Sequence, residues 1–260
     1  MSEFIWMIGS DFHIPYTNKR YMDLWWQVMR DLKPQAVDIV GDLDDACPVS
    51  RFSDGQPSEI LDAVFTYAPL VQDFFRDCRQ YADRDADIFF HGGNHEIRYQ
   101  HYVNKNAPAL RNLLTEEVLW KTDTYGVQTS SYEAPPVHRY GDIYGHHGLY
   151  VSSNAGGSVA KMMDEFGVSI ISGHSHRQGY VPKTYELRNE TLRGWELGHM
   201  TDITSPGMAY ATHHPWQPGF AVAWVESGSS VTKDGLWPHV ELVSISPDYT
   251  CKVGNKIYKA

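Results

Sequence analysis

The sequence predicts an α/β fold. Short apolar runs alternate with helical patterns through about the first 180 residues, and the strand period returns near the C-terminus. No linker rich in Pro, Gly or Ser separates the two regions. Because domain boundaries usually fall in such linkers, we expect residues 1–260 to form a single domain.

The first strand and the first helix are expected near the N-terminus. Phe4–Gly9 is an apolar run that lacks the basic region of a signal peptide, and Arg20–Leu32 has helical spacing. The inward face of this helix is expected to carry four apolar side chains, those of Leu24, Trp25, Val28 and Leu32. A strand followed by an amphipathic helix is typical of an α/β unit.

Further elements alternate along the chain. Strands are expected at Ala36–Val40, Asp87–Phe90, Asp142–Tyr144 and Val168–Ile171. The helical stretch Ser58–Tyr81 is interrupted at Pro69, which kinks the helix or starts a new one. Another helix is expected near Ser158–Phe166.

The last part of the chain is expected to add sheet to the same domain. Gly219–Val225 and His239–Ser246 alternate in the strand period. The segment Ala107–Pro136 has weak periodicity, and we expect a small lobe over the site there.

Composition excludes several classes of protein. A net charge of −10 disfavours a sequence-independent grip on nucleic acid, although bound divalent metals could supply positive charge locally. The three cysteines are far apart and lack zinc-finger spacing, which favours a reducing cytoplasm. No apolar run approaches the roughly 18 residues of a membrane span, so we expect no membrane partner.

Five short polar motifs follow the expected strands in order. They are Asp11-Phe-His13, Gly41-Asp-Leu-Asp-Asp45, Gly93-Asn-His-Glu96, His146-His-Gly148 and Gly173-His-Ser-His176. Each motif alone also occurs in ordinary turns. Ligands converge at strand ends in open α/β sheets, so the ordered set indicates a functional site.

The side chains of these motifs suit a transition metal. An Asp-x-His pair in an extended strand end would point both side chains to one face. Carboxylate oxygens, an amide oxygen and several imidazoles fit Mn²⁺, Fe or Zn²⁺ better than Ca²⁺ or a thiolate site. Glycines beside the ligands permit sharp turns and close backbone approach.

The ordered set resembles the pattern of the calcineurin-like metallophosphoesterases. That pattern is Asp-x-His, Gly-Asp-x-x-Asp, Gly-Asn-His-(Asp/Glu), His and Gly-His-x-His, and it matches within residues 11–176. The stretches 11–15, 94–98 and 216–220 further resemble the compact phosphoesterases of bacteriophages and bacteria. The resemblance implies a four-layer α/β/β/α sandwich.

The resemblance also implies a role for each motif residue. One metal would be held by Asp11, His13 and His176, and a second by Asn94, His147 and His174, with Asp42 bridging the two. A metal-bridging hydroxide would be the nucleophile. His95 would be the general acid, and Asp45 would hydrogen-bond it and fix its tautomer. The two ions are expected to be Mn²⁺, ahead of Fe or Zn²⁺.

Two adjacent pairs leave alternatives within the motifs. His147 is preferred to His146 because the family's fourth motif is usually His followed by Gly, which His147 satisfies. Asp45 is preferred to Asp44 because the family spacing selects it.

Other residues are weaker candidates. Arg98 and Arg177 could bind a nonbridging phosphate oxygen, since a guanidinium fork matches phosphate geometry, but each could equally be an exposed or capping arginine. His199 could reach the site from a loop. Trp216 could flank a substrate group, although buried aromatic residues are the commoner case.

A small phosphomonoester or phosphodiester, including a nucleotide, is the expected substrate. Protein phosphatases carry Arg-Gly after the second Asp of the second motif, whereas this chain has Ala46-Cys47. A repair-exonuclease type of nuclease acting on DNA is the alternative, but no capping domain is visible. The third reading is a non-catalytic metal-binding scaffold on the same fold, which retention of His95 and Asp45 disfavours.

Overall fold

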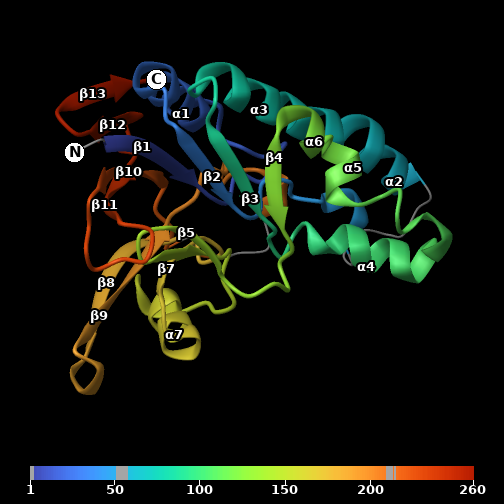
Figure 1. Cartoon of the computed structure of the whole chain (residues 1–260). Helices are drawn as coiled ribbons and strands as arrows, with labels where there is room; N and C mark the ends of the chain where they lie inside the picture. Colours follow the sequence, from blue (N-terminus) through green and yellow to red (C-terminus); the bar gives the residue numbers. More distant parts are fainter. Residues whose placement is uncertain (1–2, 51–57, 209–212, 214) are drawn as a thin grey trace.

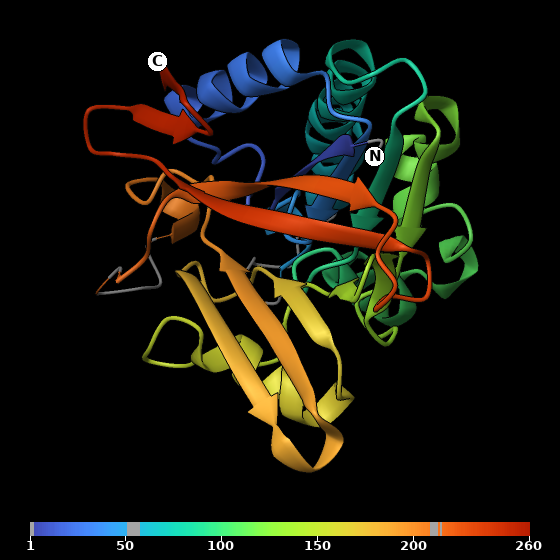
Figure 2. The same cartoon turned by 60° about the vertical axis from the view of Figure 1, so that its left-hand side comes forward.

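Two β-sheets pack face to face, with helices on both outer sides (Figures 1 and 2). The computed structural model describes residues 3–50, 58–208, 213 and 215–260. The larger sheet has six strands in the order β11-β10-β1-β2-β3-β4, and the smaller has five in the order β5-β6-β7-β9-β8. A separate two-stranded hairpin, β12–β13, ends the chain.

The larger sheet combines a parallel part with an antiparallel edge. Its strands are β1 (Glu3–Gly9), β2 (Ala36–Val40), β3 (Asp87–His91), β4 (Val127–Ser130), β10 (Gly219–Ser227) and β11 (Leu236–Ser244). β1 to β4 run parallel to one another, whereas β10 pairs antiparallel with both β1 and β11. The carboxyl ends of the parallel strands therefore meet at one edge of the sheet.

Helices cover the outer face of this sheet. They are α1 (Lys19–Leu32), α2 (Ser58–Asp62), α3 (Ala68–Tyr81), α5 (Glu116–Trp120) and α6 (Thr122–Tyr125). In α1 the apolar stripe is buried as predicted, and Leu32 packs at its margin. Pro69 lies at the start of α3, which continues from α2 through a π-helical turn without leaving the right-handed helical conformation. A proline cannot make the usual backbone hydrogen bond of a helix interior, and the change of helical turn occurs directly before it.

The smaller sheet carries its own helix. Its strands are β5 (Val137–Tyr140), β6 (Ile143–Gly145), β7 (Ser169–Ser172), β8 (Gln178–Tyr185) and β9 (Glu190–Leu197). Helix α7 (Gly157–Phe166) packs on it through Val159, Met162 and Met163. These side chains repeat at helical spacing, so one face of α7 is apolar.

Three apolar layers separate the four structural layers. One lies between the α1 and α3 helices and the larger sheet, and another lies between α7 and the smaller sheet. The middle layer joins the sheets and includes Trp6, Ile8, Ile171 and Trp195. The arrangement is therefore α/β/β/α, which confirms the predicted sandwich.

Several elements differ from the expected ones. The hairpin β8–β9 was not predicted, nor were helix α4 (Ile97–Asn106) and the hairpin of β12 (Thr250–Val253) and β13 (Lys256–Lys259). The segment 107–136, where we expected a lobe, forms α5, α6 and β4, and β4 pairs with β3 at the edge of the larger sheet. These short or half-exposed elements carry too few periodic apolar residues to be recognised locally.

Two further sequence features can be compared with the structure. Cys47, Cys78 and Cys251 are all free thiols. Over the residues described, every helix is too short or too polar to reach across a bilayer.

Candidate metal centre

Loops from both sheets meet at one polar cluster. Asp11 and His13 follow β1, Asp42 and Asp45 follow β2, and Asn94 follows β3. The smaller sheet contributes residues after two adjacent parallel strands, namely His147 after β6 and His174 and His176 after β7. The five motifs thus adjoin in space, as the resemblance to the calcineurin-like metallophosphoesterases implies.

The local backbone is more tightly turned than the sequence suggested. Asp11, His13, Asp42, His174 and His176 have φ values of 55°, 50°, 50°, 69° and 55°. The predicted extended geometry of the Asp-x-His and His-x-His segments is therefore wrong. Left-handed conformations at non-glycine residues cost free energy and cluster at functional sites, where surrounding contacts hold them.

Three side chains form the first donor group. A carboxylate oxygen of Asp11 lies 3.0 Å from Nε2 of His176, and the Nε2 atoms of His13 and His176 are 3.1 Å apart. All three residues are buried. Nδ1 of His13 donates to a carboxylate oxygen of Asp45 at 3.0 Å, which leaves Nε2 of His13 facing the cluster.

The second donor group adjoins the first. Nε2 of His147 lies 3.2 Å from an Asp42 carboxylate oxygen and 3.1 Å from Oδ1 of Asn94. His174 completes a group with Asp42 and His147 in which the possible ligand atoms lie within 4.8 Å of one another. Nδ1 of His147 contacts the main-chain oxygen of Val40 at 2.8 Å. Because a carbonyl oxygen accepts the hydrogen bond, Nδ1 carries the proton, and Nε2 of the neutral ring can bind a metal ion.

Asp42 belongs to two such groups. It lies with His147 and His174 in one, and with His13 and His95 in another. Its Oδ2 atom is 3.8 Å from Nε2 of His13 and 3.2 Å from Nε2 of His147. Asp42 therefore stands between the two sets of imidazoles.

Gly41 makes the close approach of these loops feasible. Its φ of 79° is left-handed, and an added Cβ would lie 2.4 Å from Nδ1 of His147. Any larger residue would thus displace the His147 ring from Asp42.

Electrostatics in the cluster favour mutual charge pairing. Burial raises the pKa of Asp42, but the imidazoles of His147 and His95 outweigh it and hold this pKa well below its usual range. Conversely, burial lowers the pKa of His147, and the Asp42 carboxylate raises it to about 10. A metal ion would replace the proton in such a pairing, since imidazole binds metals in its neutral form.

The donor set fits divalent transition metals. Buried carboxylates, an amide oxygen and imidazole nitrogens are present within reach of one another, and none of the free cysteines belongs to a donor group among the described residues. Imidazole-rich, oxygen-containing sites suit Mn, Fe or Zn better than Ca. The described residues thus include His and Asp groups that could hold metal ions.

His95 lies beside Asp42 but makes different contacts. Its Nδ1 donates to the main-chain oxygen of Asp45 at 2.8 Å, and the Asp45 carboxylate is 3.3 Å away. The expected contact between His95 and Asp45 is present, but the hydrogen bond goes to the main chain. Nε2 of His95 lies 3.7 Å from Asp42 and remains the nitrogen that faces the cluster.

The two candidate arginines are placed differently. Nη1 of Arg98 donates to the same main-chain oxygen of Asp45, at 2.9 Å, so this guanidinium lies next to His95. Arg177 instead donates to the main-chain oxygen of Ser152. Only Arg98 is therefore tied to a residue of the cluster by a hydrogen bond among the described residues.

The adjacent residues that were set aside face elsewhere. His146 accepts from the N–H of Gly148 at 3.0 Å and packs near Tyr132 and Phe166. Burial lowers its pKa to about 4. Asp44 accepts from the Tyr99 hydroxyl at 2.6 Å.

Glu96 is a supporting residue that sequence reasoning did not assign. Its fully buried carboxylate accepts from the N–H groups of Asp42 at 3.1 Å, Gly93 at 2.8 Å and Asp44 at 3.0 Å. Burial raises the pKa of Glu96 well above its usual range, and the N–H groups act in the opposite sense. An acid directly after the Asn-His pair was the only signal, and it could not reveal these partners.

His199 and Trp216 lie against the first donor group. The His176 ring is 4.3 Å from the Trp216 ring and 5.7 Å from the His199 ring, measured between centroids. Gln217 fixes this arrangement, because its N–H donates to His176 and its main-chain oxygen accepts from His199. His199 thus approaches the site from a loop, as the sequence suggested.

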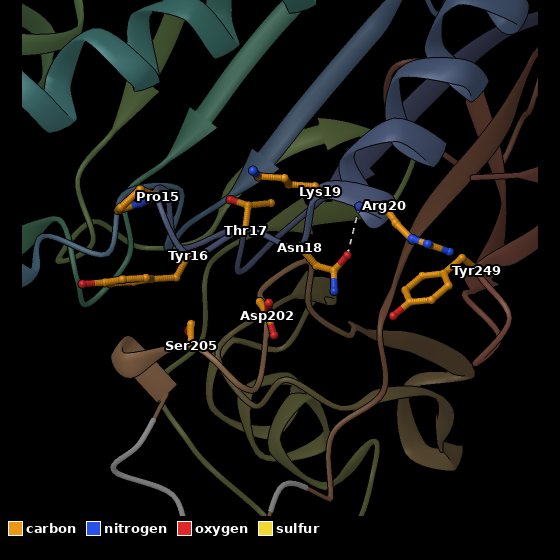
Figure 3. Close-up of a pocket in the computed structure, with 9 residues that line it drawn as sticks. All are labelled: Pro15, Tyr16, Thr17, Asn18, Lys19, Arg20, Asp202, Ser205 and Tyr249. Atoms are coloured by element: carbon orange, nitrogen blue, oxygen red, sulfur yellow. Dashed lines mark hydrogen bonds between the residues drawn. The ribbon is translucent and has the colours of Figure 1, made fainter.

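A pocket of about 380 Å³ opens beside the loop that follows His13 (Figure 3). It is lined by Pro15, Tyr16, Thr17, Asn18, Lys19, Arg20, Asp202, Ser205 and Tyr249. The Arg20 guanidinium lies 4.5 Å from the centre of the Tyr249 ring at one end. At the other end, Tyr16 donates its N–H to the main-chain oxygen of His13.

Two bacteriophage proteins resemble the chain in sequence over most of its length. No family model matches the chain. The chain is 28% identical over 247 residues to the Gene 54 protein of Mycobacterium phage D29, covering 92% of each. It is also 28% identical over 248 residues to the Gene 54 protein of Mycobacterium phage L5, again over 92% of each.

Solved structures resemble the chain at low identity. Vacuolar protein sorting 29 of Cryptosporidium parvum has a TM-score of 0.49 and 13% identity over 99% of both chains. A predicted phosphoesterase of Streptococcus pneumoniae has a TM-score of 0.39 and 10% identity over 93% of this chain and 99% of that one. The nuclease MPE of Pseudomonas putida has a TM-score of 0.37 and 12% identity over 90% and 87%, respectively.

Proposed function

We propose that this protein is a binuclear metal-dependent hydrolase of phosphate esters. The position of Asp42 carries the proposal, because this carboxylate groups with His147 and His174, lies 3.8 Å from Nε2 of His13 in the other donor group, and lies 3.7 Å from Nε2 of His95. Two ligand sets joined by one carboxylate suit a pair of ions roughly 3.5–4 Å apart. A lone metal site would need no such shared carboxylate.

Each donor group would hold one ion. Asp11, His13 and His176 would bind one, Asn94, His147 and His174 the other, and Asp42 both. When bound, such a pair of ions polarises the phosphoryl group and lowers the pKa of a bound water. Mn²⁺ is the ion we favour, ahead of Fe or Zn²⁺, because the donor set mixes hard oxygens with imidazoles.

His95 would deliver a proton to the leaving group. Its Nδ1 is held by the main-chain oxygen of Asp45, so its Nε2 points toward the cluster. A group held in this way can protonate a departing alkoxide, a contribution of roughly 10²–10⁴ in rate. Arg98 shares the same carbonyl and would lie close enough to stabilise a nonbridging phosphate oxygen.

A small phosphate ester or a nucleotide is the substrate class we favour. We assign the pocket that begins at Pro15, two residues after His13, to a group beyond the phosphate, although none of its lining residues belongs to the donor groups. The Arg20 and Tyr249 pair in its wall would contact an anionic or aromatic part of that group. A net charge of −10 disfavours long nucleic acid. A DNA nuclease of the repair-exonuclease type is therefore the alternative.

A substrate screen of the purified Mn²⁺-loaded protein tests the proposal. The panel should contain monoesters, diesters, cyclic nucleotides, and single- and double-stranded DNA. We expect turnover of a small ester or nucleotide that a chelator abolishes and Mn²⁺ restores. Turnover of DNA alone would support the nuclease.

The same screen addresses a non-catalytic scaffold. Such a protein would bind two ions by calorimetry and yet hydrolyse none of these esters. Metal binding without turnover would therefore replace the enzyme by the scaffold, whereas a protein that binds no metal would contradict both.

A further inference from the structure

A buried ion pair connects the two sheets close to the candidate metal centre. Arg139, on β5 of the smaller sheet, donates to both carboxylate oxygens of Asp38, on β2 of the larger sheet, at 2.7 and 2.9 Å. The Asp38 carboxylate is fully buried, and the Arg139 side chain is only 7% exposed. Such a two-pronged contact fixes orientation as well as distance.

Further partners complete this network. His91 on β3 contacts Asp38 at 3.0 Å through Nε2, and Arg139 also donates to Asp87 at 2.8 Å. Asp87 accepts from the hydroxyl of Tyr140 as well. We call Asp38, His91, Asp87, Arg139 and Tyr140 the inter-sheet network. It joins β2, β3 and β5: Arg139 and Tyr140 make the contacts from the smaller sheet to the larger, and His91 links β3 to β2 within the larger sheet.

The network lies on the strands that deliver one donor group. Asp38 precedes Asp42 by four residues on the β2 segment, and His91 precedes Asn94 by three on the β3 segment. β5 pairs with β6, and His147 follows β6. Asp42 and Asn94 therefore follow strands that carry members of the network, and His147 follows a strand that is paired with one. His174, which follows β7, is the exception.

β6 also rests directly on the network. A Cβ added at Gly145 would lie 2.4 Å from Cε1 of His91, so the β6 backbone packs against this imidazole. His147 is only two residues further along the chain. The position of the His91 ring therefore limits how close β6, and with it His147, can come to β3.

General stabilisation does not explain the network well. Removing two charges from water costs about as much as their attraction returns, so apolar residues would hold the sheets together equally well. Apolar contacts between two sheets are non-directional and tolerate sliding. A two-pronged ion pair allows one relative position, which is what ligands drawn from two sheets require.

We infer that Arg139 and Asp38 are positioning residues that set the larger sheet against the smaller one so that His147 meets Asp42 and Asn94. This inference rests on the proposed function. The first donor group, Asp11, His13 and His176, also draws on both sheets, but it follows β1 and β7, which carry no member of the network and lie beside β2 and β6. The effect of the network should therefore be larger on the ion held by His147 than on the other ion.

The test replaces Arg139 with a residue of the same charge but without the fork. Arg139→Lys is expected to fold, because a cation still faces Asp38. It should weaken binding of one Mn²⁺ by roughly tenfold, the low end of what loss of a direct partner of a metal ligand costs, and weaken binding of the other by less. Calorimetric titration of chelator-treated protein measures both affinities.

Arg193→Lys is the matched control. Arg193 also spans the sheets, because it pairs with Asp142 and donates to the main-chain oxygen of Pro238 on β11 at 3.2 Å. Its main-chain N–H donates to the hydroxyl of Ser169, which begins β7, whereas His174 follows the other end of that strand. We expect Arg193→Lys to leave both Mn²⁺ affinities at their wild-type values.

A second variant and a spectroscopic readout separate positioning from folding. Asp38→Asn with Arg139→Gln removes both charges, keeps the shape of the Asp38 side chain and shortens that of Arg139, and it should also lose affinity for one ion. Electron paramagnetic resonance should then show an uncoupled Mn²⁺ in place of a coupled pair. Equal weakening of both ions, no weakening, or the same loss in Arg193→Lys would overturn the inference. Wild-type protein that binds no Mn²⁺ would instead contradict the proposed function.

Discussion

The Nδ1 atom of His13 lies 3.0 Å from a carboxylate oxygen of Asp45. The sequence assigned Asp45 to His95 alone, yet its side chain is closer to His13 and its main-chain oxygen is what His95 contacts. Histidine ligands usually donate their second nitrogen to such a partner, which fixes the tautomer and raises basicity. Asp45 thus connects a candidate metal ligand with the candidate acid.

Asp45→Asn should therefore affect metal binding as well as turnover. An asparagine loses the charge that orients His13, so the affinity for one Mn²⁺ should fall by about 10–100-fold. The main-chain contact to His95 survives, and the rate at saturating Mn²⁺ should fall less than in a His95 variant. Calorimetry and kinetics at several Mn²⁺ concentrations measure the two effects. A loss of rate with unchanged Mn²⁺ affinity would return Asp45 to a role at His95 alone.

His95→Ala should separate chemistry from metal binding. Both ions and the fold should be retained, and the rate should fall by roughly 10²–10⁴ on esters with a poor leaving group. On an activated aryl ester the loss should be smaller, because that group departs without a proton. The ratio of the two losses is the measurement. Full activity on unactivated esters, or loss of an ion, would show that His95 is not the acid.

Asp42→Asn tests the shared ligand. Removing the carboxylate that groups with His147 and His174 and also faces His13 should reduce two bound ions to one or none. Elemental analysis of protein prepared without chelator gives the stoichiometry. If the variant still held two ions, Asp42 would lose its bridging role.

Glu96→Gln should destabilise the loop that carries Asp42. The amide nitrogen of glutamine would face one or two of the N–H groups that now point at the carboxylate, and each unsatisfied buried donor costs about 1–3 kcal/mol. Denaturant unfolding and Mn²⁺ affinity should both weaken. Glu196→Gln is a matched control, because Glu196 is equally buried and accepts from Gly156, Ser158 and Val159. It should lose stability without losing Mn²⁺ affinity.

The inter-sheet network should give stability that is lost in acid. Burial raises the pKa of Asp38, but Arg139 and His91 outweigh it and hold that pKa below its usual value. Such a carboxylate contributes stability above its unfolded pKa of about 3.9 and loses it as the pH falls toward the folded pKa. Burial also lowers the pKa of His91, so its contribution is lost as the pH falls below about 6.5.

Urea unfolding at a series of pH values measures this dependence. Wild-type stability should fall as the pH is lowered through both ranges. Asp38→Asn with Arg139→Gln keeps His91 and should show the fall near its ordinary pKa, but a shallower one in the more acidic range. Parallel curves for the two proteins throughout would show that Asp38 contributes no pH-dependent stability.

The sequence by itself determined the layers of the fold and the members of the cluster. Apolar periodicity placed β1, α1 and β2 closely, because these elements bury a continuous face and the pattern of burial is written locally. Short polar motifs after those strands named the cluster, since the carboxyl ends of parallel strands share an edge. Exposed or short elements such as β4 and β8 left no comparable pattern.

Only the tertiary structure decided how the cluster is oriented. The left-handed backbone at Asp11 and His13 is held by contacts between loops, so no local rule predicts it. No local rule predicts the long-range hydrogen bonds either. Asp45 and His13 are 32 residues apart in the sequence, Glu96 and Asp42 are 54 apart, and Arg139 and Asp38 are 101 apart. A hydrogen bond depends on the directions of both groups, and those directions are set only when the two sheets pack together.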